Sequence, residues 1–500
     1  MNSTFSSLDW IVFIGYFLIL GLSSYLFSRT KITSTREYFV GSNAMPMFAV
    51  AISVLATSQS AATFLGAPEF SYKYDFTFIG FYFSGLIAVI FVAYVLVPRF
   101  YAMKAVTVYE LLEKRYGQVA KKQAGIMFLL GRVLASGARL YIGSLAISMI
   151  LFGDIIFTHV AISIIILILG ALAYTYFGGV TSVIFSDIIQ ALIYIGAGLA
   201  VLIFLYYSLE NIDIVQVLND NNKLRVIDTS IDGKFSVIGL LSGWLLLNIA
   251  AFGLDQDMTQ RVLSCKNEKE AAKSLIVSML LTIPVVLIFM TIGALLFVFY
   301  QNAEVTQSFE GENITIFMYY ILNEMPEGLR GLVTIGAIAA ALSSTNSVLG
   351  AMASIAIEDL YKPWKLQRGE VDDLHFLKAS RNAVLFFAVV LSAMAMLSYF
   401  WQRYSELSLI GFALGVMAFA YTGLLGVYFS AIFTTRGNPT TVPFSLLGGF
   451  FTVLALQPYT FGITIGFSWQ IVIATIVSFL IMQLASKNKT DNTQRQNQSY

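Results

Sequence analysis

Long apolar runs alternate with short polar segments along almost the whole chain. About a dozen of these runs approach or exceed the ~20 residues that an α-helix needs to cross ~30 Å of hydrocarbon. The pattern predicts an all-α integral membrane protein. Its thirteen predicted spans lie near 9–27, 46–66, 77–98, 123–151, 154–176, 183–208, 236–256, 273–300, 331–356, 379–401, 405–432, 441–458 and 465–485.

Composition supports the membrane class and excludes several functions. Charged residues make up 12% of the chain, against roughly 25% in soluble domains. The single cysteine, Cys265, excludes an internal disulfide and a multi-cysteine metal site. His159 and His375 are too far apart in the sequence to indicate a ligand cluster. A net charge of +1 gives no reason to expect nucleic acid as a partner, and no loop is long enough for a catalytic domain, so an enzyme is not expected.

The basic residues predict how the chain lies in the membrane. Of the 30 Lys and Arg residues, 22 fall in segments on one side of the predicted spans and six on the other. Because cytoplasmic loops are enriched in Lys and Arg, we expect the N-terminus outside and the C-terminus in the cytoplasm, in a multi-pass protein of the plasma (inner) membrane. The polar tail 486–500 is expected to be disordered.

The second predicted span holds five polar residues near its middle, where such groups are costly unless they face a cavity or a partner. They are Thr57, Ser58, Gln59, Ser60 and Thr63. One interpretation is helix packing through small hydroxyl groups. The other is a broken helix, whose unwound carbonyls could coordinate a cation and whose half-helix N-terminus could face an anionic group.

Two later spans contain further oxygen donors. Ala340, Ser343 and Ser344 share one helical face in the ninth span. A carbonyl and two hydroxyls without a carboxylate suit a monovalent cation better than a divalent one, although a Ser/Thr packing seam fits the spacing equally well. Asp187 lies near the start of the sixth span. It could cap that helix, because the helix dipole favours an acid at the N-terminus.

Three ordered motifs resemble those of the sodium/solute symporter family, and the resemblance covers about residues 5–485. The first is Tyr174-Thr-Tyr-Phe-Gly-Gly-Val-Thr-Ser-Val-Ile-Phe-Ser-Asp-Ile-Ile-Gln190. The second is Asp255-Gln-Asp-Met-Thr-Gln-Arg261. The third runs from Ala339 to Ser347 and is followed by Asp359-Leu-Tyr361.

The resemblance implies a LeuT-type fold within a single transporter domain, 1–485. Two inverted five-helix repeats would occupy about 46–208 and 236–432, with one helix before them and two after. The family's main sodium site carries over to backbone oxygens of the second span and to the serine pair of the ninth: Ala56, Gln59, Ala340, Ser343 and Ser344. Its two-sodium members have a second site, which here corresponds to Asp187, Asn346 and Ser347, and the asparagine departs from the family's hydroxyl.

The resemblance also bears on the solute. Sugar-transporting relatives use a lysine and a tyrosine at positions matched here by Thr282 and Ala251, which disfavours a sugar. Sialic-acid-type relatives hold the solute carboxylate with an arginine matched in register by Ala135, with Arg132 and Arg139 one turn to either side. These arginines could pair with a solute carboxylate, with Asp187 or another acid, or reach the interface. The candidate substrate contacts are Ser58, Ser60, Thr63, Phe78, Tyr82, Arg132, Arg139 and Asn248.

These observations predict a sodium-coupled symporter that imports a small organic solute by alternating access. An organic acid or amino-acid-like solute is favoured over a sugar or polyol. The expected partners are the solute, Na⁺ as coupling ion and the lipid bilayer, with the protein acting as a monomer. The alternatives from other classes are a channel and a solute-sensing membrane module. Proton coupling is disfavoured because the main ion site has no carboxylate.

Overall fold

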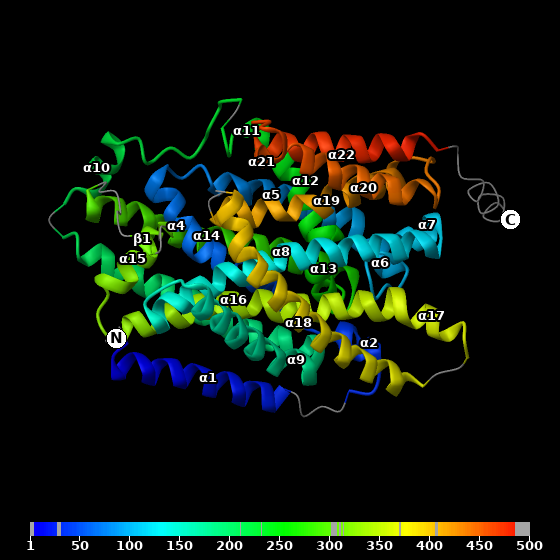
Figure 1. The fold of residues 1–500 in the computed structure, drawn as a ribbon, viewed down its shortest axis with the longest axis horizontal. Coiled ribbons are helices and arrows are strands. Elements are labelled where there is room, and N and C mark those ends of the chain that lie inside the picture. The colour runs from blue at the N-terminus through cyan, green and yellow to red at the C-terminus, as the bar shows by residue number, and fades with distance from the viewer. Residues whose placement is uncertain are drawn as a thin grey trace.

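The protein is a bundle of helices that run along one common direction. The computed structural model describes residues 5–27, 32–210, 212–231, 233–301, 308–309, 312–313, 315–369, 372–405 and 409–485. Most long helices lie along the longest axis of the molecule (Figure 1). Within the described residues, the only strands are the two-residue β1 (Ser308–Phe309) and β2 (Glu312–Asn313), which pair antiparallel. The predicted disordered tail, 486–500, lies outside the described residues.

Helices form nearly all of the regular structure. They are α1 (Ser7–Phe27), α2 (Thr35–Val40), α3 (Met47–Ser58), α4 (Ala61–Lys73), α5 (Ile79–Phe91), α6 (Val97–Ala102), α7 (Glu110–Tyr116), α8 (Gln118–Phe152), α9 (Phe157–Tyr207), α10 (Ile214–Asp220), α11 (Val237–Leu240), α12 (Gly243–Ile249), α13 (Gln256–Val262), α14 (Glu268–Tyr300), α15 (Ile316–Asn323), α16 (Leu329–Ser354), α17 (Lys362–Leu366), α18 (Asp373–Ser405), α19 (Leu409–Phe433), α20 (Thr441–Ala455), α21 (Pro458–Phe461) and α22 (Phe467–Gln483). A 3₁₀ turn, η1 (Gly41–Asn43), and three π-helical segments, η2 (Val92–Leu96), η3 (Ala250–Leu254) and η4 (Ile355–Tyr361), extend or join them.

The apolar helices agree with the predicted spans in position, whereas their number stays a prediction. Among the described residues, eight helices are long and apolar enough to cross a membrane, and the bent pair α3 and α4 raises this to nine. Shorter apolar helices cover Ser7–Ser23, Thr441–Ala455 and Phe467–Gln483. The count also treats α9 as one helix, although the sequence predicts two spans there.

The 51 residues of α9 would extend about 75 Å as one straight helix, far more than the ~30 Å hydrocarbon core. Gly179 interrupts it with non-helical backbone angles, φ 55° and ψ −155°. A Cβ atom there would lie 2.4 Å from the carbonyl oxygen of Tyr38, so only glycine fits. The two predicted spans, 154–176 and 183–208, therefore lie on either side of a real break.

The second predicted span is also broken. Helix α3 ends at Ser58, α4 begins at Ala61, and the two are bent by 63°. Gln59 and Ser60 between them have extended backbones. The broken-helix interpretation of this polar segment is confirmed. The end of α3 leaves its last carbonyl oxygens without helical partners, and because this end is buried in the bundle they need some other ligand.

Helix α16 forms the centre of the bundle, and it packs along α9, α8 and α3. Every residue from Val333 to Leu349 is buried. The hydroxyl groups of Ser343 and Ser344 therefore face protein rather than lipid. The two serines therefore act inside the bundle, either by packing against neighbouring helices or by binding a ligand.

Asp9 joins α1 to the start of α16. Its Oδ1 accepts hydrogen bonds from the backbone amides of Gly328, at 2.8 Å, and Gly331, at 2.7 Å. Amides at a helix N-terminus lack helical partners, so this carboxylate caps α16 from a separate helix.

We expect Asp9→Ala to lower the free energy of unfolding by about 0.5–2 kcal/mol, the usual cost of losing a cap. The measurement is the thermal unfolding midpoint of purified protein in detergent. Asp9→Asn keeps one acceptor oxygen and should lose less. Equal midpoints for the wild type and Asp9→Ala would contradict the capping role.

Candidate functional site

A central cavity lies where the break between α3 and α4 meets α5, α8, α12, α14 and α19. All eight candidate substrate contacts line it, which brings together residues from four separate predicted spans. The rest of the lining is Ala62, Phe81, Ala251, Phe252, Met258, Met279, Thr282, Met417 and Tyr421. The cavity is therefore mostly apolar and aromatic, with a few polar groups at defined positions. That composition is typical of a binding site for a small organic molecule.

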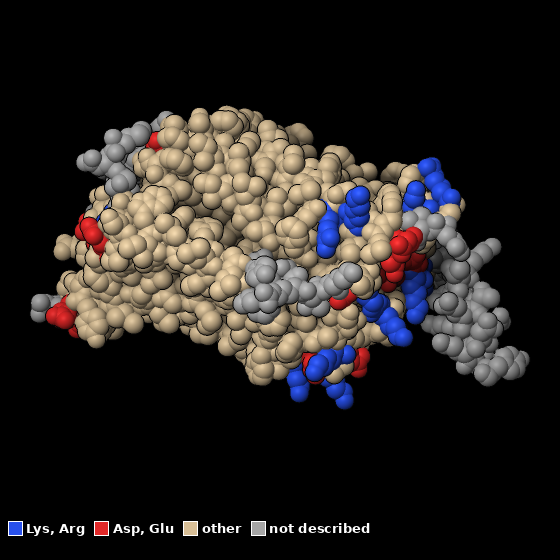
Figure 2. Space-filling model, turned by 90° about the horizontal axis from the view of Figure 1, so that it is seen from below, with Lys and Arg blue, Asp and Glu red and all other residues tan. Residues whose placement is uncertain are grey.

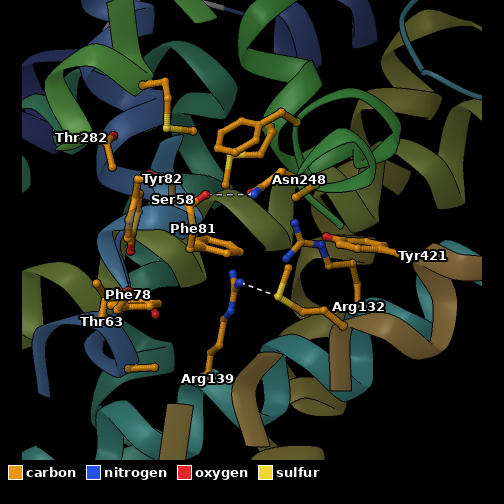
Figure 3. A pocket seen from close by; sticks show the side chains of 17 residues that line it. Ser58, Thr63, Phe78, Phe81, Tyr82, Arg132, Arg139, Asn248, Thr282 and Tyr421 are labelled. Atoms are coloured by element: carbon orange, nitrogen blue, oxygen red, sulfur yellow. Dashed lines mark hydrogen bonds between the residues drawn. The ribbon is translucent and has the colours of Figure 1, made fainter. Parts of the chain in front are cut away.

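Arg139 points its guanidinium group into this cavity (Figure 3). Its Nη2 lies 2.9 Å from the sulfur of Met417. Within the described part of the chain, no carboxylate lies within ion-pairing distance of Arg139. Of the two predicted kinds of partner, an acid of the protein and a carboxylate of the solute, the described residues therefore do not supply the first to Arg139.

Arg132 also lines the cavity but is paired with acids. It binds both carboxylate oxygens of Asp255, with Nε 3.1 Å from Oδ1, and its Nη2 lies 3.1 Å from Oδ2 of Asp257. The Tyr421 hydroxyl donates to Oδ2 of Asp255, the oxygen that Arg132 Nη2 also contacts, and Figure 3 places Tyr421 beside Arg132. For Arg132, pairing with another acid of the protein is the correct alternative. The acid is not Asp187.

A second, smaller cavity lies between the α3–α4 break, α9 and α16. Four of the five predicted sodium ligands line it: Ala56, Gln59, Ala340 and Ser343. The fifth, Ser344, is buried on the same helix, and its hydroxyl donates to the carbonyl oxygens of Ala340 at 3.3 Å and Ala341 at 3.0 Å. The remaining lining is Gln190, Ala191, Tyr194 and Ala339. Residues of the broken helix and of α16 that carry candidate carbonyl and hydroxyl ligands thus line one small space.

Asp187 lies at the edge of this oxygen cluster and is fully buried. Its Oδ1 accepts a hydrogen bond from Ser343 at 2.8 Å, and its Oδ2 accepts one from Ser53 at 2.5 Å. Arg261 Nη2 lies 3.1 Å from the same Oδ2. The capping interpretation of Asp187 is wrong, because the residue lies eight positions beyond the break at Gly179, inside α9, and its oxygens bind side chains of three other helices.

Asn346 and Ser347 lie one turn beyond Ser343 on the same face of α16. The Ser347 hydroxyl donates to the carbonyl oxygen of Ser344 at 2.9 Å. Neither atom of the Asn346 side-chain amide has a hydrogen-bond partner among the described residues, although the amide is buried. Buried polar groups are normally satisfied, so this amide is available to a ligand.

Sequence reasoning missed several residues around these sites. Asp255 and Asp257 belong to a quoted motif, and their acidic character at the end of a predicted span could have identified them as partners of Arg132. Met417 and Tyr421 lie in an apolar run, where no sequence signal distinguishes a cavity wall from lipid-facing surface.

The chain resembles known transporters over nearly its full length. The model of the sodium:solute symporter family matches residues 38–440. The sodium/sialic acid symporter SiaT of Proteus mirabilis is 26% identical over 465 residues, 91% of this chain and 90% of that protein. The sodium-coupled monocarboxylate transporter 2 of Mus musculus is 26% identical over 372 residues, 72% of this chain and 58% of that protein.

A solved structure supports the fold. It is a substrate-bound, outward-open Na⁺-coupled sialic acid symporter, with a TM-score of 0.81 and 24% sequence identity, and the match covers 97% of this chain and all of that one. The expected family, LeuT-type fold and sodium coupling are confirmed, and a catalytic role is excluded by the family. The chain belongs to the sodium:solute symporter family and is a multi-pass, sodium-coupled symporter of a small solute.

Proposed function

We propose that this symporter imports an organic acid whose carboxylate binds Arg139 in the central cavity. The observation that carries the proposal is an arginine on the cavity wall without an acid partner among the described residues. A guanidinium inside the membrane costs about 2.5–3.5 kcal/mol even on insertion scales that give low values. A solute carboxylate can accept two parallel hydrogen bonds from it and offset much of that cost.

The rest of the cavity supports an acid over a sugar. Thr282 and Ala251, at the positions where sugar-transporting relatives have lysine and tyrosine, both line the cavity and supply neither group. Asn248 donates to the carbonyl oxygen of Phe81 at 3.2 Å, so part of its hydrogen-bonding capacity is already used. The names of two relatives point to acids as well, since one carries sialic acid and the other monocarboxylates.

We propose that the main sodium ion binds between the break in the second span and α16. Its ligands would be the backbone oxygens of Ala56, Gln59 and Ala340 with the hydroxyls of Ser343 and Ser344. The small cavity between these elements and the absence of a carboxylate from the ligand set support a monovalent cation. An ion held there would join α3 to α16, which alternating access would separate. Its release would therefore allow these two helices to move apart.

The proposed orientation has the N-terminus outside and the C-terminus in the cytoplasm. On the face shown in Figure 2, Lys and Arg side chains gather at the end of the molecule where α7 and α17 lie. This enrichment supports a cytoplasmic location for that end. Sodium would then move down its gradient and along the membrane potential, which contributes ~2.3 kcal/mol per charge per 100 mV. We also propose that the chain contains two inverted repeats, 46–208 and 236–432, and that it acts as a monomer in the bilayer.

A solute screen tests the proposed function. Purified protein is heated with candidate solutes in NaCl and, separately, in KCl at equal ionic strength. The panel pairs N-acetylneuraminic acid with its uncharged methyl ester, and propionate with propionamide, together with a neutral sugar. We expect an acid to raise the unfolding midpoint only in sodium, and its uncharged analogue to have no effect. Stabilisation by the sugar or by the uncharged analogues alone would contradict the proposal.

We further propose that a second sodium ion binds at Asp187, Asn346 and Ser347. The buried amide of Asn346 and the orientation of Asp187 Oδ1 toward α16 support this site. The reversal potential of the transporter in proteoliposomes, with the solute that the screen identifies, gives the number of sodium ions moved per solute. We expect Asp187→Asn to lower that number by one. An unchanged number would assign Asp187 a structural role only.

A further inference from the structure

A continuous chain of buried ion pairs joins the wall of the central cavity to the proposed sodium site. It runs from Arg132 through Asp257 and Arg261 to Asp187, and ends at the hydroxyl of Ser343. The four charged residues are each at most 3% exposed. Arg132 lines the central cavity and Ser343 lines the small cavity, so the two ends of the chain belong to different binding sites.

Each link has the geometry of a direct contact. Arg132 Nη2 lies 3.1 Å from Asp257 Oδ2, and Asp257 Oδ1 lies 3.2 Å from Arg261 Nη1. Arg261 Nη2 then lies 3.1 Å from Asp187 Oδ2, and Ser343 donates to Asp187 Oδ1 at 2.8 Å. Two different oxygens of each carboxylate serve the two neighbours, so neither acid can turn without breaking one link.

One short helix carries the middle of this chain. Asp257 and Arg261 lie four residues apart in α13 and therefore on the same helical face. Through Asp257, α13 holds the cavity residue Arg132. Through Arg261, it holds the sodium-side residue Asp187. A displacement of α13 must change both contacts together, which makes this helix a mechanical connection between the two sites.

The paired groups of this chain carry one more negative than positive charge, and the third buried arginine, Arg139, lies at the central cavity and forms no ion pair with these acids. Asp255 also pairs with Arg132, so three carboxylates share two guanidinium groups. In a buried site of low dielectric constant an excess negative charge is costly. The end of the chain at Asp187 and Ser343 is the place where a bound sodium ion would compensate it.

We propose that this chain couples the two sites, with Asp257 and Arg261 as positioning residues. The inference rests on the proposed sodium site at Ser343. A sodium ion bound to a lone pair of the Ser343 oxygen polarises the hydroxyl and strengthens its hydrogen bond to Asp187. Asp187 then holds Arg261 and α13 more firmly, and α13 fixes Arg132 in the cavity wall. Solute that contacts a fixed Arg132 binds better, and by linkage sodium binds better in return.

The test measures sodium binding alone, so it requires no knowledge of the solute. The probe is NaCl, titrated into the purified full-length protein at constant ionic strength with KCl, and the readout is the sodium concentration that gives half of the thermal stabilisation. We expect Arg132→Gln and Asp257→Asn each to raise this midpoint by about fivefold or more, the lower range of typical coupling between sites. The double variant should raise it by less than the product of the two, because both substitutions break the same link.

Two further variants separate coupling from damage. Lys121→Gln breaks a different buried ion pair, in which Lys121 Nζ lies 3.3 Å from Asp359 Oδ1, and should leave the sodium midpoint unchanged. Arg132→Lys keeps the charge and should give a smaller shift than Arg132→Gln, which provides a test even if the glutamine variant unfolds.

The results of these measurements distinguish a coupling role of the chain from a structural one. A lower unfolding midpoint in KCl with an unchanged sodium midpoint, in either Arg132→Gln or Asp257→Asn, would assign the chain a structural role and overturn the proposal. A failed solute screen would refute the organic-acid proposal and leave this test intact. If sodium does not stabilise even the wild type more than potassium does, the proposed sodium site and the coupling chain are both wrong.

Discussion

Ser343→Ala is expected to raise the sodium concentration for half-maximal transport at least severalfold. The substitution removes one of the proposed ligands from the small cavity between the broken helix and α16. It also removes the hydrogen bond that Ser343 donates to Asp187 at 2.8 Å, so a buried carboxylate oxygen loses a donor. Leaving a buried charged group without its partner costs about 1–3 kcal/mol or more, which adds to the loss of the ligand.

Ser344→Ala should act in the same direction with a smaller effect. Its hydroxyl contacts carbonyl oxygens within α16, and no hydrogen bond links it to Asp187. Thr345→Ala is the matched control, because the Thr345 hydroxyl donates to the Ala341 carbonyl at 2.8 Å and the residue does not line the small cavity. The measurement is solute uptake into proteoliposomes as a function of external sodium. Unchanged sodium dependence in both serine variants would refute the site.

Part of the candidate site could be predicted from the pattern of polar residues, and part only from the resemblance to the family. Polar groups in the middle of an apolar span must face a cavity or a partner, and this reasoning singles out the second span and the serine pair of α16, although a packing seam fits the spacing of each equally well. The resemblance to the family then predicted that these two segments contribute ligands to the same sodium site. All eight candidate substrate contacts line one cavity, although Phe78 and Tyr82 were predicted from the family resemblance and not from polar patterning.

The side-chain partners could not be predicted in the same way. Arg132 and Arg139 lie on the same face of the same predicted span, and nothing in the sequence pattern distinguishes them. In the structure Arg132 binds two acids, whereas Arg139 binds none among the described residues. The difference arises from α13 and its N-cap, more than a hundred residues away in sequence, which present Asp257 and Asp255 to Arg132 and not to Arg139. Asp187 was ambiguous for a related reason, since its depth in α9 depends on the break at Gly179.

Arg139→Lys is expected to raise the half-saturation constant for the transported acid tenfold or more. A planar guanidinium can donate two parallel hydrogen bonds to a carboxylate, and an ammonium group cannot reproduce that geometry. A tenfold change corresponds to about 1.4 kcal/mol, well within the strength of one charge-assisted hydrogen bond. Arg139→Gln removes the charge as well and should abolish saturable uptake of the acid.

The choice of Arg139 over Arg132 follows from their surroundings, because Arg132 already has its carboxylates. Met417→Leu is the matched control. It removes the sulfur that lies 2.9 Å from Arg139 Nη2 while it keeps the arginine and the apolar wall, so the half-saturation constant should change little. The measurement is the initial rate of uptake into proteoliposomes at saturating sodium, with the amount of folded protein checked by gel filtration. If Arg139→Lys transports the acid with unchanged half-saturation, or if the solute is a neutral sugar or polyol, Arg139 does not bind a carboxylate and the solute must be held by other groups of the cavity.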